Sequence, residues 1–134
     1  MDATLTAPRV APKSSILWTG RILSALPALL MIFSAYVKLT HNPQAVQGLG
    51  ALGLGPDSLT VIGIIELSCV AIYLIPPTAA LGAILIAAYL GGAVLAHMIM
   101  HQPVWAPVLT AVVAWVGLYL REPRLRALFP LQKQ

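Results

Sequence analysis

A single glutamate within a long apolar stretch is the residue in this chain best placed to do chemistry. Glu66 is followed by Cys69 and Tyr73 at i+3 and i+7, spacings that place the three side chains on one face of an α-helix. In a lipid bilayer, a charged side chain at mid-depth costs about 2.5–3.5 kcal/mol on insertion scales. We therefore expect Glu66 to face the interior of a helix bundle, where it has a partner or carries a proton.

Two basic side chains are candidate partners of Glu66. Lys38 lies near the end of the first apolar run, and His97 lies near the end of the third. If successive runs alternate in direction, all three groups fall in the same half of the membrane, so a Glu–Lys or Glu–His pair is geometrically reasonable. One interpretation is a proton-active or ligand-binding site formed by Glu66 and His97. The other is a structural hydrogen bond, with Lys38 extending to the membrane surface.

Familiar cofactor patterns are missing around these residues. His97 and His101 share a helical face, but no cysteine or carboxylate joins them, so we predict no metal site. The glycine-rich residues 48–55 follow no strand, which argues against a phosphate-binding loop and a nucleotide. Cys69 is the only cysteine, so an internal disulfide and a dithiol pair are excluded.

The composition places these residues in a membrane protein. The 134-residue chain is 59% hydrophobic and 9% charged, with a mean hydropathy of +0.87, whereas a soluble domain is about 45–50% apolar and about 25% charged. A chain of this length cannot bury so much apolar surface in one soluble core. The net charge of +4 indicates membrane orientation rather than a nucleic-acid partner.

Four apolar runs are long enough to cross the bilayer, which takes about 17–25 helical residues. Because backbone groups in lipid must bond within their own segment, each run should be α-helical. The predicted spans are residues 18–39, 58–75, 78–100 and 104–120. The sequence therefore predicts an all-α fold, an antiparallel four-helix transmembrane bundle with an external loop, residues 41–57, after the first helix.

The flanks of these spans predict domain limits and orientation. We expect a flexible cytoplasmic tail at residues 1–15, a membrane domain at residues 16–122 and an amphipathic cytoplasmic tail at residues 123–134. Seven of the eight Lys and Arg residues fall on one side, and Lys38 alone falls on the other. The positive-inside rule then places both termini in the cytoplasm, in a multi-pass protein of the bacterial inner membrane.

Small residues on the third run are candidates for close helix packing. In lipid, helices associate through small residues that let backbones approach. Ala88, Gly92 and Ala96 recur every four residues, and Gly91 lies on a neighbouring line. We expect these four residues to lie at helix contacts, and we expect Gly92→Leu to destabilise the fold.

Four segments resemble the DoxX-like family of small bacterial membrane proteins. They are residues 32–39, 62–67, 89–97 and 117–123, and the third segment, YLGGAVLAH, is the most specific. The resemblance implies four helices in the inner membrane and no defined reaction. Related DoxX and DoxD proteins are associated with thiosulfate:quinone oxidoreductase or with membrane redox complexes.

The leading functional hypothesis is a redox-linked membrane subunit that binds a small apolar ligand, such as a quinone, near Glu66 and His97. Electron carriers would then come from a membrane redox partner, because this chain has no catalytic motif of its own and an enzyme is disfavoured. One alternative is a proton-linked transporter or channel component, which would require a homo-oligomer. Another is a structural assembly factor without a ligand.

Overall fold

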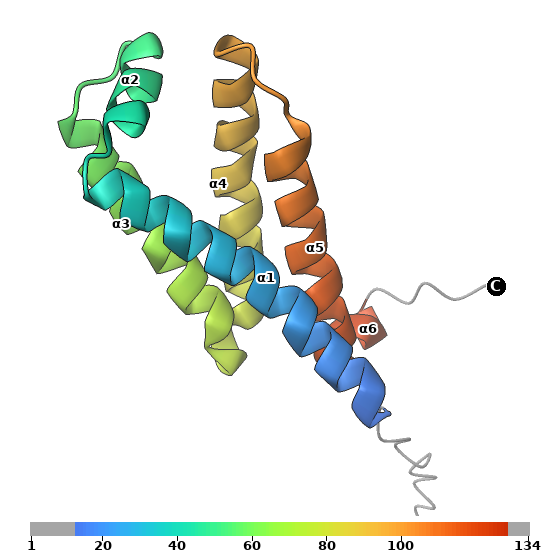
Figure 1. Cartoon of the computed structure of the whole chain (residues 1–134). Helices are drawn as coiled ribbons and strands as arrows, with labels where there is room; N and C mark the ends of the chain where they lie inside the picture. The colour runs from blue at the N-terminus through green and yellow to red at the C-terminus, as the bar shows by residue number, and fades with distance from the viewer. Residues whose placement is uncertain (1–12, 129–134) are drawn as a thin grey trace, which may run out of the picture.

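The computed structural model describes residues 13–128, and these residues fold into helices joined by short connections (Figure 1). The prediction of an all-α protein is confirmed, with short helices in addition to the long ones. The helices are α1 (Ser14–Leu39), α2 (Pro43–Ala51), α3 (Asp57–Leu74), the 3₁₀-helix η1 (Pro76–Thr78), α4 (Ala79–Ile99), α5 (Trp105–Arg121) and α6 (Pro123–Leu128).

Prolines and left-handed residues end the helices where the chain reverses. Ile75 and Glu122 both precede a proline and both have extended backbone angles, as steric conflict with the proline ring requires. Ile75 thereby ends α3 before η1, and Glu122 separates α5 from α6. Between α4 and α5, His101 has a φ of 54° and turns the chain without a glycine.

The predicted external loop is largely helical. The Asn42 side chain accepts a hydrogen bond from the Gln44 backbone N–H at 3.0 Å, and Pro43 occupies the first turn of α2. This is a favourable helix start, because the cap satisfies a free N–H and the proline has none to satisfy. The helix continues through Gly48 and Gly50 to Ala51 and ends before Gly53, which has a φ of 75°.

The long helices contact one another in the order α1, α3, α4, α5, and α5 closes the circle by packing on α1. The start of α1, η1 and α6 lie at one end, whereas α2 and the α4–α5 connection lie at the other (Figure 1). The interior is mainly apolar. Its most completely buried side chains are Tyr73, Met31, Leu59, Ile86, Leu118, Glu66 and Val70.

The outward faces of the helices are also apolar. Leu29 and Phe33 on α1 are each 64% exposed, and Leu95 on α4 is 59% exposed. Within residues 13–128, three segments are long and apolar enough to cross a membrane: α1, α3 and the stretch from Pro76 to Ile99. The fourth apolar helix, α5, has 17 residues, near the lower limit for spanning about 30 Å of hydrocarbon.

Glycines allow two pairs of helix backbones to touch. A Cβ at Gly82 of α4 would clash with the Tyr73 backbone nitrogen of α3, and one at Gly117 of α5 would lie 2.7 Å from the Ser24 nitrogen of α1. Only a residue without a side chain fits at either position. These two contacts hold α4 on α3 and α5 on α1.

The residues of α4 that were predicted to pack against other helices do not form its packing face. Ala88, Gly91 and Gly92 are exposed, Ala96 is half-buried, and a Cβ at either glycine would meet no atom within 4 Å. The packing face of α4 is instead formed by Ala79, Gly82, Ala83, Ile86 and Leu90. Gly92→Leu should therefore leave the packing of this chain intact, contrary to the prediction from the sequence, because its side chain would point away from the other helices.

The glycine contacts give a prediction with a matched control. We expect Gly82→Ala to lower the thermal midpoint in detergent, because the added methyl group overpacks a backbone contact by about 1–3 kcal/mol or more. Gly92→Ala should keep or raise the midpoint, since alanine favours an exposed helix over glycine by about 1 kcal/mol. Equal midpoints for the two variants would contradict the assigned packing face.

Candidate functional site

An ion pair between a buried carboxylate and a partly buried lysine joins α1 to α3. The Lys38 Nζ lies 2.8 Å from the Glu66 Oε2, and Ser34 Oγ donates to the same oxygen at 3.3 Å. Lys38 also donates to Ser34, so the three polar groups form a closed set of contacts. Of the two partners predicted for Glu66, lysine is the one that contacts it.

Helix periodicity brings this set together. Ser34 and Lys38 are one turn apart on α1, so their side chains lie above one another on one face. The adjacent turns of that face carry Met31 and Ala35, both buried in the interior. Apolar packing between α1 and α3 therefore determines where the polar groups meet.

The pair lies in apolar surroundings. Glu66 is only 2% exposed, and the Lys38 side chain is 19% exposed. Removing one member of a buried pair typically costs about 3–5 kcal/mol, because the other charge is left unpaired. The amine and the carboxylate are thus interdependent, and Lys38 remains partly open to the outside of the helix assembly.

Two further side chains lie near the carboxylate. Tyr89 of α4 is close enough to Glu66 for its phenol to interact with the carboxylate, and Cys69 follows Glu66 by one turn on the buried face of α3. Cys69 is a free, buried thiol. The site therefore draws on α1, α3 and α4, and it offers an amine, two hydroxyls, a thiol and a carboxylate.

Two predicted site residues have other partners. The Tyr73 hydroxyl donates to the Ala114 carbonyl of α5 at 2.7 Å. It therefore connects α3 to α5 and does not take part in the Glu66 contacts. His97 is half-buried, and its Nδ1 is 2.7 Å from the Ala93 carbonyl within its own helix. The contacts of His97 in the described part of the chain do not include Glu66.

Neither Ser34 nor Tyr89 was predicted as a site residue from the sequence. The signal for Ser34 was its spacing from Lys38. Tyr89 had a weaker signal, since one aromatic residue in an apolar helix is typical of ordinary packing. Within residues 13–128, no group of three or more His, Cys, Asp or Glu side chains is arranged to hold a metal ion.

A model of the DoxX-like family matches residues 22–119. Neither the curated proteins nor the solved structures contained a match to this chain. The matched residues include α3 and α4 entirely and most of α1 and α5, and therefore every residue of the Lys38–Glu66 site. Because this match covers well over half of the sequence, the chain belongs to the DoxX-like family.

Proposed function

We propose that this protein is a membrane subunit that binds a small apolar ligand with hydrogen-bonding carbonyls, such as a quinone, at the Lys38–Glu66 site. Its membership of the DoxX-like family and its apolar helices make it an integral membrane protein. The proposal adds four antiparallel spans in the inner membrane, both termini in the cytoplasm, and electron carriers supplied by a redox partner.

The observation that carries this proposal is the Lys38–Glu66 pair between apolar helices. Ionisable residues inside membrane spans are rare, and they commonly mark ligand, ion or proton sites. Packing alone gives no reason for the pair, because a buried pair is often no more stable than well-packed apolar residues of the same volume. A role in binding accounts for the presence of both charges.

The pair has hydrogen-bonding capacity to spare. A lysine ammonium carries three N–H donors, and in the described part of the chain Lys38 donates to Ser34 and Glu66. One donor remains for a carbonyl oxygen of the ligand. The surrounding apolar helix faces favour a ring or hydrocarbon chain over a water-soluble anion.

The distribution of Lys and Arg bears on orientation. Among residues 13–128, Lys38 is the only Lys or Arg at the end of the molecule near α2, whereas the opposite end carries Arg21, Arg121 and the arginines of α6. The positive-inside rule weighs Lys and Arg near the ends of the spans. This asymmetry supports a cytoplasmic position for the start of α1 and for α6.

Quinone binding is tested with the purified full chain and decylubiquinone, by native mass spectrometry from detergent. We expect the wild-type protein to retain the quinone. Glu66→Gln should weaken retention by about tenfold or more, since hydrogen bonds to charged groups contribute about 1.5–3 kcal/mol. Asp57→Asn, an exposed carboxylate on the same helix, should bind like wild type.

Three results would contradict the quinone proposal. One is the absence of retained quinone in wild type, and another is equal retention by Glu66→Gln and wild type. The third is Glu66-dependent proton or solute flux in liposomes without quinone binding, which would favour the transporter alternative. Loss of complex assembly on deletion of the whole protein, with Glu66→Gln and His97→Ala fully functional, would favour an assembly factor.

A second prediction separates the stability of the pair from its role in binding. Lys38→Met leaves a buried carboxylate unpaired and should lower the free energy of unfolding by about 3–5 kcal/mol. The double variant Lys38→Met/Glu66→Gln should recover most of that loss while remaining unable to bind quinone. The check is thermal unfolding in detergent, and a double variant no more stable than Lys38→Met would contradict the direct pairing.

Orientation is tested with reporter fusions in the bacterial membrane. A green fluorescent protein at the C-terminus should fluoresce, and alkaline phosphatase at the same position should be inactive. Alkaline phosphatase inserted at Gly53, an exposed residue after α2, should be active. The reverse pattern at the two positions would place the termini outside the cytoplasm and overturn the proposed orientation.

A further inference from the structure

A second group of charged residues surrounds a cavity at the end of the molecule that carries η1 and α6. The cavity has a volume of about 160 Å³, well above the roughly 30 Å³ that one water molecule occupies in the liquid. Its polar lining is Arg21, Arg121 and Glu122, and apolar walls are provided by Leu17, Leu118 and Pro76.

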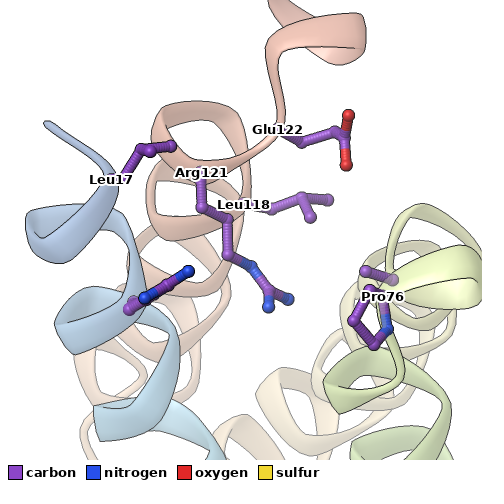
Figure 2. A pocket seen from close by; sticks show the side chains of 7 residues that line it. Leu17, Pro76, Leu118, Arg121 and Glu122 are labelled. Carbon is purple, nitrogen blue, oxygen red and sulfur yellow. The ribbon is translucent and has the colours of Figure 1, made fainter. Parts of the chain in front are cut away.

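Arg121 is held in place by groups that carry no negative charge. One of its terminal nitrogens donates to the Tyr73 carbonyl at 2.9 Å, and its guanidinium carbon lies 4.9 Å from the centre of the Tyr73 ring. Its Nε is buried and has no acceptor in the described part of the chain. Figure 2 shows the side chain extending from α5 into the space that Pro76 borders on the other side.

Among the described residues, the second arginine also has no carboxylate partner. The Arg21 guanidinium carbon lies 5.2 Å from the centre of the Trp18 ring, and the residue is exposed. In the part of the chain that the structure describes, the Lys38–Glu66 contact is the only ion pair. Two arginines therefore border one cavity with their charges uncompensated by an ion pair.

Glu122 is the one negative group of the cavity lining. Its Oε1 accepts a hydrogen bond from the Arg124 backbone N–H at 3.3 Å, at the start of α6. In Figure 2 its carboxylate points away from the Arg121 guanidinium. The lining thus retains a net positive charge, with the carboxylate engaged by the backbone that follows it.

We propose that this cavity binds the phosphate group of an anionic molecule, with Arg21 and Arg121 as its ligands. Guanidinium groups suit phosphate because they are permanently charged and their planar donors can bind two oxygens at once. The apolar walls formed by Leu17, Leu118 and Pro76 would accommodate the hydrocarbon next to the phosphate. This favours an anionic phospholipid headgroup over a free phosphate as the source.

This phosphate site is independent of the quinone proposal, because it shares no residue with the Lys38–Glu66 site. Its test uses native mass spectrometry of the full chain with phosphatidylglycerol as the anionic probe and phosphatidylcholine as the zwitterionic probe. Separate arms add glycerol 3-phosphate or inorganic phosphate as competitors. The variants are Arg21→Gln and Arg121→Gln, with Arg124→Gln as the control, since Arg124 is exposed on α6 and does not line the cavity.

We expect wild type to prefer phosphatidylglycerol, and either cavity variant to bind it about fivefold more weakly, the effect of one arginine at an anionic surface. Arg124→Gln should bind like wild type, and Glu122→Gln should bind more tightly. If Arg121→Gln does not fold, the exposed Arg21 still tests the site. Competition by glycerol 3-phosphate at matched concentration would support the phosphate site and identify its ligand as water-soluble.

Three outcomes would overturn the phosphate site. One is an equal loss of phosphatidylglycerol in Arg21→Gln and Arg124→Gln, which would indicate general surface charge rather than a cavity. Another is equal binding of phosphatidylglycerol and phosphatidylcholine by wild type, since a cavity with uncompensated positive charge should prefer the lipid with a net negative charge. A bound anionic lipid that is unaffected by either cavity variant would likewise place it elsewhere on the molecule.

Discussion

A carboxylate buried among apolar helices must find a cation, and this requirement constrains how α1 and α3 can lie against each other. Glu66 of α3 is 2% exposed, and its partner Lys38 lies on α1, which packs against α3. Sliding one helix along the other by a single turn would separate the charges. A buried polar contact can specify register in this way even where it adds little net stability.

Close backbone contacts supply the second constraint on the helices. Gly117 permits α5 to approach α1, and Gly82 permits α4 to approach α3. The Tyr73 hydroxyl then connects α3 to α5 through the Ala114 carbonyl. Because these contacts involve the backbone itself, side-chain repacking cannot easily compensate for added volume at either glycine.

Sequence patterns were most informative where one physical rule dominated. Pro76 and Pro123, the first residues of η1 and α6, end the preceding helices by the steric rule for residues before proline, and the cost of a charge in lipid predicted the inward position of Glu66. Small residues were less informative, because glycine and alanine occur at helix contacts and on lipid-facing surfaces alike. Gly82 and Gly92 look similar in the sequence, and only the position of Tyr73 distinguishes them. A histidine in a helix can pair its ring with a carbonyl of its own helix, and His97 does so with Ala93.

The buried face of α3 offers a carboxylate to Lys38 but only neutral groups to Arg121. Glu66 on this face is matched by Lys38, whereas Arg121 meets the neutral carbonyl and ring of Tyr73 further along the same face. Positive charge is thus cancelled at the end proposed to be external and retained at the end proposed to be cytoplasmic. Since anionic lipid headgroups attract basic residues at the cytoplasmic surface, the proposed orientation and the proposed phosphate site follow from the same distribution of charge.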